Sequence, residues 1–246
     1  MKDLTTSIYT FEDLIQGNFL YVDKTEYIWQ LVKHVGESYF LSRPRRFGKS
    51  LTVSTLKAVF EGKKELFKGL AIYDKPYDWK PCPIIHLDMN GRDFSTLESM
   101  EERFRQILRK QAEINGVTLK ETSSDTMFHE LIKTLHDQNG DVVLLLDEYD
   151  KPILNNISKE NCSAFLDALK IFYSVIKEKN GMIRLAFITG VSKFCHASLS
   201  SELNNLTDIT MDTRFATMLG YTQEELEANF SDRLTILAGD HDELMQ

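Results

Sequence analysis

The sequence has few of the residues that build metal centres or covalent cross-links. Its only cysteines are Cys82, Cys162 and Cys195, and no two of them are close enough to form a CxxC pair. The histidines show no metal-ligand spacing either. We therefore expect neither a zinc site nor a disulfide framework, and we interpret the cysteines as reduced, buried thiols.

Long apolar runs and an excess of basic charge are also lacking. The longest clean apolar run is residues 142–146, whereas a membrane-spanning helix needs roughly 20 residues. The N-terminus lacks an apolar segment followed by a small-residue cleavage site, so no signal peptide is expected. The 29 basic and 37 acidic side chains give a formal charge of -8, which argues against a surface that coats nucleic acid by charge alone but leaves room for a local basic patch. We expect a soluble cytoplasmic protein.

The chain contains no internal repeat, low-complexity segment or Pro/Gly/Ser-rich linker. Its 42% hydrophobic and 11% aromatic residues are typical of a globular protein. Short apolar runs alternate with long amphipathic stretches. This alternation predicts an α/β fold with a mainly parallel central sheet covered by helices on both sides, in which ligands bind at the carboxyl ends of the strands.

The alternation also predicts where the elements lie. The expected strands are residues 38–41, 83–88, 142–146 and 183–188, with a short fifth strand within 206–211. The expected helices are residues 49–60, 96–115, 125–136 and 162–179, with one more after a Thr222–Glu225 capping box. We interpret residues 1–36 as a helical lead-in, 37–215 as the core, and 216–246 as a helical segment that begins a lid or a further domain.

Residues 42–50, SRPRRFGKS, follow an expected strand and begin an expected helix, which is the context of a P-loop. Gly48 would let backbone N–H groups turn toward a phosphate, Lys49 would reach the terminal phosphates, and the Ser50 hydroxyl would ligate Mg²⁺. Arg43 occupies the position of the first glycine of GxxxxGK[ST], so a basic turn before an ordinary helix is the alternative. The predicted ATP-binding residues are Arg45, Arg46, Phe47, Gly48, Lys49, Ser50 and Leu51.

Two carboxylates follow the most apolar expected strand. We predict that Asp147 holds Mg²⁺ through its water shell and that Glu148 polarises the attacking water as a general base, which typically contributes about 10²–10⁴-fold. A solvated strand end is the alternative. Asp150 either helps to position Glu148 or has a surface role. Thr189, at the end of another strand, is the first choice for sensing the γ-phosphate or orienting the water, with Ser192 second and a strand-ending turn as the alternative.

Several segments together resemble the bacterial AAA-ATPase-like family. They are YVDKT at 21–25, RPRRFGKSL at 43–51, LDEYD at 146–150, TGVSKF at 189–194, LNNL at 203–206 and GYTQEEL at 220–226. The resemblance covers nearly the whole chain, and an arginine in place of the first glycine is usual in this family. It implies an additional-strand P-loop ATPase fold, in which the Thr189 strand separates the P-loop strand from the Asp147 strand.

Members of this family often carry a C-terminal PD-(D/E)xK nuclease-like domain. Glu61-Gly62-Lys63 matches ExK formally, but it lies at an expected helix end without a plausible partner aspartate. We therefore expect the nuclease-like part to lie outside these residues, in a longer chain or in a partner, unless this is a short member of the family.

The resemblance also suggests a use for the lead-in, whereas several arginines are candidates because of their positions in the sequence. Asp23 and Thr25 would hydrogen-bond the adenine, with a structural turn before a helix at 25–35 as the alternative. Arg45 and Arg46 would contact phosphate, an acidic partner or a nucleic-acid backbone, and Arg214 would reach a neighbour's nucleotide if the protein forms an oligomer. An ordinary surface salt bridge is the alternative for each arginine.

Three functions fit this pattern. The first is a Mg²⁺-dependent ATPase that acts as a conformational switch for an attached or partner effector. The second is a nucleotide-binding scaffold that does not hydrolyse, and the third is a P-loop phosphotransferase. Glu148 beside Asp147 favours hydrolysis, and the lack of an arginine-rich lid disfavours the phosphotransferase.

Overall fold

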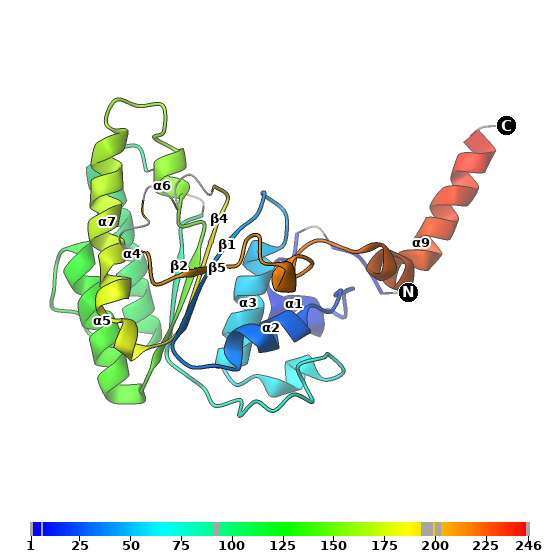
Figure 1. Cartoon of the computed structure of the whole chain (residues 1–246), viewed down its shortest axis with the longest axis horizontal. Coiled ribbons are helices and arrows are strands. Elements are labelled where there is room, and N and C mark those ends of the chain that lie inside the picture. The colour runs from blue at the N-terminus through cyan, green and yellow to red at the C-terminus, as the bar shows by residue number, and fades with distance from the viewer. Residues whose placement is uncertain (1, 6, 91–93, 193–198, 200–202, 245–246) are drawn as a thin grey trace.

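The computed structural model describes residues 2–5, 7–90, 94–192, 199 and 203–244. Within these residues the centre of the molecule is a five-stranded parallel sheet with the order β2-β3-β4-β1-β5 (Figure 1). The strands are β1 (Glu37–Ser42), β2 (Ile84–Asp88), β3 (Val142–Asp147), β4 (Ile183–Gly190) and β5 (Thr207–Asp208). The order confirms that the strand ending near Thr189 lies between the P-loop strand and the Asp147 strand.

Helices cover both faces of the sheet. The group on one face consists of α4 (Leu97–Ile114), α5 (Ser124–Asn139) and α7 (Cys162–Glu178). The group on the other face consists of α1 (Phe11–Gln16), α2 (Thr25–Val32) and α3 (Lys49–Phe60). Shorter segments are α6 (Lys151–Leu154) and the 3-10 turns η1 (Lys64–Phe67), η2 (Asn180–Met182) and η3 (Thr213–Phe215). The last helix, α9 (Gln223–Leu244), extends away from the body of the molecule (Figure 1).

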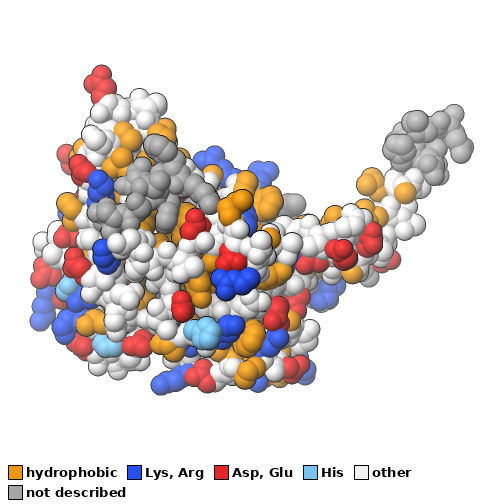
Figure 2. All heavy atoms as spheres, in the orientation of Figure 1, with side chains coloured by type: hydrophobic (Ala, Val, Ile, Leu, Met, Phe, Trp, Pro, Cys, Tyr) orange, Lys and Arg blue, Asp and Glu red, His pale blue; other side chains and the backbone are white. Residues whose placement is uncertain are grey.

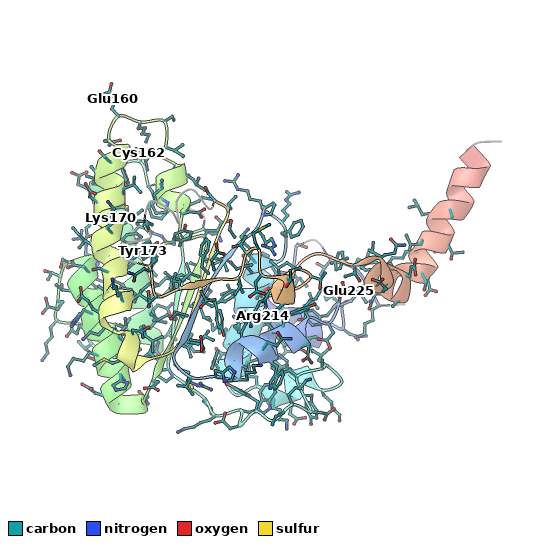
Figure 3. All side chains as sticks on the ribbon, viewed as in Figure 1. Glu160, Cys162, Lys170, Tyr173, Arg214 and Glu225 are labelled. Carbon is teal, nitrogen blue, oxygen red and sulfur yellow. The ribbon has the colours of Figure 1, made fainter. Side chains whose placement is uncertain are left out.

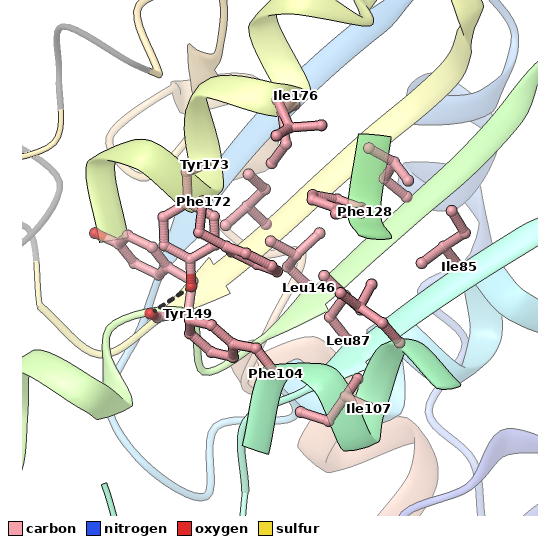
Figure 4. Close-up of a cluster of buried hydrophobic side chains, with 14 of the residues drawn as sticks. Ile85, Leu87, Phe104, Ile107, Phe128, Leu146, Tyr149, Phe172, Tyr173 and Ile176 are labelled. Atoms are coloured by element: carbon pink, nitrogen blue, oxygen red, sulfur yellow. Dashed lines mark hydrogen bonds between the residues drawn. The ribbon is translucent and has the colours of Figure 1, made fainter. Parts of the chain in front are cut away.

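The central strand β3 is buried along its whole length, as its continuous apolar run predicts. Successive side chains of a strand point to opposite faces. Leu144 and Leu146 therefore join the core beneath α4, α5 and α7, whereas Val143 and Leu145 join the core on the α3 side. Aromatic rings fill the first core, where Phe172 stacks on Phe104 and Phe128 with centroid separations of 4.3 and 5.0 Å (Figure 4).

The element boundaries differ from the sequence expectations in a few places. Helix α2 ends at Val32 rather than at residue 35, and α5 continues past residue 136 to Asn139, where Gly140 takes a positive φ of 87°. The fifth strand is reduced to two residues beside β1. The thiols of Cys82 and Cys162 are free but only half-buried, which corrects the expectation of buried thiols, and Cys195 lies outside the described residues.

Two further expectations concern the charge of the surface and the character of the helices. Acidic and basic side chains intermingle on the face shown in Figure 2. In the part of the chain that the structure describes, none of the helices combines the length and the apolar character that crossing a bilayer requires.

Candidate functional site

The loop between β1 and α3 has the backbone geometry of a phosphate cradle. Gly48 has a φ of +93° and Arg46 a φ of +62°, both in the left-handed region that suits glycine far better than arginine. A Cβ on Gly48 would meet only Leu219, at 3.7 Å, so the backbone angle rather than space requires glycine there. Helix α3 begins directly after Gly48, and its first N–H groups and dipole favour an anion at this point.

Lys49 is held inside this loop. Its side chain is buried, and Nζ donates hydrogen bonds to the carbonyl oxygens of Arg43 at 3.0 Å and Pro44 at 2.9 Å. Burial lowers the pKa of Lys49, while the nearby carboxylates of Asp147 and Glu148 oppose that shift. The ammonium group is thus desolvated and lies close to the acidic end of β3.

Three elements meet at the carboxylate of Asp147. The Ser50 hydroxyl, from α3, donates to Asp147 Oδ2 at 2.5 Å, and the Thr189 hydroxyl, from β4, donates to Asp147 Oδ1 at 2.5 Å. Asp147 is 3% exposed and Thr189 is 0% exposed. The structure therefore brings these three predicted residues together. Hydroxyl and carboxylate oxygens are the kind of ligands that Mg²⁺ takes in proteins.

Glu148 follows in a strained conformation, with a φ of +53°. Its backbone N–H points to the Thr189 hydroxyl at 3.4 Å, and its carboxylate pairs with Lys151 Nζ at 3.1 Å. Both side chains of this ion pair are largely buried. The pairing was missed in the sequence, although the three-residue spacing of Glu148 and Lys151 at the start of a helical turn was its visible signal.

Two cavities meet at the P-loop. The first, of about 1040 Å³, is lined by residues 46–51, Asp147 and Glu148, and it continues past His86 and Asp88 at the end of β2. The second, of about 640 Å³, lies between Tyr21 and Val22 of the lead-in and Leu219 and Tyr221 before α9. Residues 46–48 line both cavities. Concave sites of this size commonly hold small ligands.

Asp23 and Thr25, the predicted adenine contacts, form hydrogen bonds with nearby backbone and with each other. Asp23 Oδ1 accepts hydrogen bonds from the Thr25 N–H and hydroxyl, and Asp23 Oδ2 accepts from the Ala71 N–H at 2.7 Å. The Thr25 hydroxyl accepts from the Ile72 N–H at 3.1 Å. Neither Asp23 nor Thr25 lines either cavity. Their polar atoms serve the structural turn that was the alternative, and the neighbours Tyr21 and Val22 face the second cavity instead.

The remaining sequence candidates are peripheral or support the loop. Arg45 is exposed and lines neither cavity, and Arg214 forms an exposed ion pair with Asp212 at 2.6 Å (Figure 3). Asp150 is fully buried, so the surface role considered for it is wrong. Ser192 meets Asp150 through its backbone N–H, at 2.7 Å from Oδ2.

A link between distant parts of the chain lies beside the second cavity, which Lys24 helps to line. Lys24 Nζ pairs with Glu225 Oε1 at 2.5 Å and donates to the Thr217 carbonyl at 2.7 Å. Glu225 also caps α9, because its Oε2 accepts from the Thr222 N–H at 2.9 Å, as the capping box predicts. Figure 3 shows Glu225 at the base of α9. Lys24 thereby ties the lead-in to the start of α9, and we call this pair the Lys24–Glu225 latch.

Comparison with known proteins places the chain beside one family and one curated relative. Residues 5–200 match the model of the AAA-ATPase-like family, described as a predicted AAA-ATPase. The chain is also 39% identical over 247 residues to a protein named "Uncharacterized protein in vnfD 5'region" from Azotobacter chroococcum mcd 1. That match covers 99% of this chain and 47% of the relative, so the chain spans about half the length of the curated relative.

Proposed function

The chain belongs to the AAA-ATPase-like family of predicted AAA-ATPases, and from this premise we propose that it binds Mg-ATP at the P-loop and hydrolyses it. One observation carries the proposal: hydroxyls of Ser50 and Thr189 converge on both oxygens of the buried Asp147 carboxylate. A carboxylate buried at the end of an apolar strand is costly unless it is satisfied. Here its partners are the groups that a Mg²⁺-nucleotide site needs.

The side chains around the first cavity then have distinct roles. Lys49 exchanges the carbonyl oxygens of Arg43 and Pro44 for terminal phosphate oxygens, and the N–H groups of residues 46–51 surround the phosphates. Ser50 and, through water, Asp147 would hold Mg²⁺, which would neutralise phosphate charge when bound. Glu148 accepts the proton of the attacking water, and Thr189 responds to the γ-phosphate.

We place the adenine in the second cavity. Its walls combine the aromatic rings of Tyr21, Phe47 and Tyr221 with the aliphatic side chain of Leu219, and it shares residues 46–48 with the phosphate cavity. Such walls suit a flat, largely apolar ring. This placement moves the proposed adenine contact from Asp23 and Thr25 to Tyr21 and Val22, one to four residues earlier in the chain.

The Lys24–Glu225 latch supports the proposal that nucleotide occupancy acts as a switch. The latch borders the second cavity, and Glu225 stands at the base of the protruding α9. A base that enters this cavity would contact Lys24 of the latch and so favour one position of α9 over another. A ligand shifts a conformational equilibrium only through such a difference in its contacts with the two states. The effector would be a further part of a longer protein or a partner; a nuclease-like identity for it rests on the family resemblance alone.

A scaffold that does not hydrolyse is the second candidate, favoured by the ion pair that engages Glu148 with Lys151. The test measures Mg-ATP binding by calorimetry and phosphate release for wild type, Lys49→Ala and Glu148→Gln. We expect Lys49→Ala to weaken binding by tenfold or more, about 1.4 kcal/mol. Glu148→Gln should retain binding and lose turnover by about 10²–10⁴-fold.

Lys133→Ala is the matched control, because Lys133 is exposed on α5, across the sheet from the P-loop. It should behave as wild type. Equal ATP affinity in Lys49→Ala and wild type would refute the P-loop assignment. Binding without phosphate release above the Glu148→Gln level would instead favour the scaffold.

A further inference from the structure

Asp150 fastens the loop after β3 to the turn after β4. Its side chain is 0% exposed, and Oδ2 accepts the backbone N–H groups of Val191 at 2.9 Å and Ser192 at 2.7 Å. The carbonyl oxygen of Asp150 accepts from the N–H groups of Ile153 and Leu154, so the same residue begins α6. One residue thus anchors both the start of a helix and the turn that follows Thr189.

The neighbours of Asp150 tighten the same junction. The Tyr149 N–H donates to the Thr189 carbonyl at 3.0 Å, and the Tyr173 hydroxyl donates to the Tyr149 carbonyl at 2.9 Å (Figure 4). A Cβ on Gly190 would lie 2.5 Å from the Tyr149 ring and 3.1 Å from Asp150 Cγ. Because no side chain would fit at position 190, the end of β4 packs directly against residues 149–150 of the loop after β3.

This junction surrounds the strained Glu148. A non-glycine residue with a positive φ persists only where the structure around it over-determines its conformation. Glu148 has a φ of +53° and lies between Asp147, bonded to the Thr189 hydroxyl, and Asp150, bonded to the turn at Val191. Loss of the hydrogen bonds from Val191 and Ser192 to Asp150 would leave Glu148 fixed only through Asp147, on its N-terminal side.

Burial raises the pKa of Asp150, and the two backbone N–H groups only partly offset this cost of a buried carboxylate. Its Oδ1 has no hydrogen-bond partner among the described residues. A neutral amide oxygen could accept the same two N–H groups with less desolvation cost.

We propose that Asp150 is a positioning residue for ATP hydrolysis, which sets the placement of the Glu148 carboxylate relative to the Thr189 hydroxyl by holding the turn at Val191 and Ser192 against the Glu148 loop. The inference rests on the proposed ATPase function. Asp150 lines neither cavity and so acts through its neighbours rather than on the nucleotide.

The test compares Asp150→Ala, Asp150→Asn and Asp150→Glu in the full chain, with kcat, KM, Mg-ATP affinity and melting temperature measured for each. Asp150→Ala should lower kcat on the order of 10²-fold, the scale of a misplacement of about 1 Å, with ATP affinity unchanged. Asp150→Asn should keep kcat within several-fold, because its amide oxygen can accept both N–H groups. Asp150→Glu keeps the charge but displaces the oxygens, so kcat should fall and binding should persist.

Asn156→Ala is the matched control. Asn156 is also 0% exposed, and its Nδ2 donates to the carbonyl oxygens of Phe94 and Pro152, away from β4. It should lose stability and keep kcat. The proposal is overturned if Asp150→Ala and Asp150→Glu keep kcat, if Asp150→Asn falls as far as Asp150→Ala, or if Asn156→Ala loses kcat equally.

Failure of the inference and failure of the proposed function give different results. If the wild type binds Mg-ATP without releasing phosphate, hydrolysis itself is refuted and the positioning role falls with it. If wild type hydrolyses ATP and only Glu148→Gln loses turnover, the ATPase stands and the role of Asp150 is refuted.

Discussion

Several residues of this site are polar groups that the fold has removed from water. Lys49, Asp147 and Thr189 are all at most 5% exposed, and each is held by partners from another element or from the loop. His86, in the middle of β2, extends this pattern, because its Nε2 is buried without a partner among the described residues. Such groups respond to pH and substitution more strongly than surface residues do.

The pH dependence of stability tests the burial of His86. Burial lowers the pKa of His86 below its usual 6.5, with Asp88 and Asp147 opposing the shift and Lys57 and Lys110 adding to it. At pH values between the lowered pKa of folded His86 and the ordinary pKa of about 6.5 in the unfolded chain, the imidazole is protonated mainly in the unfolded chain. The free energy of unfolding therefore decreases as the pH falls below about 6.5. We expect the free energy of unfolding in urea to fall more steeply from about pH 7.5 to about pH 5.5 in wild type than in His86→Gln, by at most about 1.4 kcal/mol per pH unit. His34→Gln is the control, because His34 is exposed and its replacement should leave the pH dependence unchanged. A plot of unfolding free energy against pH that runs parallel in His86→Gln and wild type would contradict the prediction.

Among the elements, β3 determines where the acidic residues of the site stand. It lies between β2 and β4, with its side chains shared between the cores on the two faces of the sheet. Its register with β2 places Asp147 beside Asp88, and Thr189 closes the other side. A shift by one residue would exchange its side chains between the two cores and move Asp147 away from Ser50 and Thr189.

A cavity in β3 tests how much this packing contributes. Leu144→Ala should lower the free energy of unfolding by about 2–5 kcal/mol, because the side chain is fully buried and rigid neighbours cannot close the space. Ile171→Ala, at a 60% exposed position on α7, should stay within about 0.5 kcal/mol of wild type. Urea unfolding measures both values, and a similar small change in the two variants would mean that β3 is not a principal element of the core.

At the scale of the whole molecule, residues from both ends of the described chain come together at the P-loop. The second cavity takes walls from the lead-in, the P-loop and the segment that precedes α9, and the Lys24–Glu225 latch joins the first and last of these. Arg233 of α9 donates a hydrogen bond to the Lys2 carbonyl oxygen, so the first described residues lie beside this helix (Figure 1). If the second cavity holds the adenine as proposed, α9 is the element through which we expect occupancy to be transmitted.

A double-mutant cycle tests the latch. Lys24→Glu and Glu225→Lys should each weaken ATP affinity and increase hydrogen exchange in α9, because each leaves like charges in a partly buried contact. The double variant Lys24→Glu, Glu225→Lys should recover on the order of 1 kcal/mol of ATP-binding free energy relative to the sum of the single variants. Recovery will be incomplete, since Glu225 also caps the Thr222 N–H. Additive effects of the two substitutions would show that the pair does not couple the lead-in to α9.

The sequence by itself determined much of this architecture. Continuous apolar runs identify buried parallel strands, and the placement of Gly48, Lys49, Asp147 and Thr189 at strand ends predicts that they meet, because all carboxyl ends of a parallel sheet lie at one edge. The strand order came from the family resemblance rather than from periodicity, because hydrophobic patterns carry no information about which strands are neighbours.

Only the tertiary structure decided the contacts between segments distant in sequence. It committed Asp23 and Thr25 to a structural turn, buried Asp150 against the turn at Val191, and joined Lys24 to Glu225 beside the second cavity. Local pattern shows which residues suit a strand, a cap or a loop. The partner of a buried or latched polar group depends on which distant segment packs against it, and that follows from the packing of the whole chain.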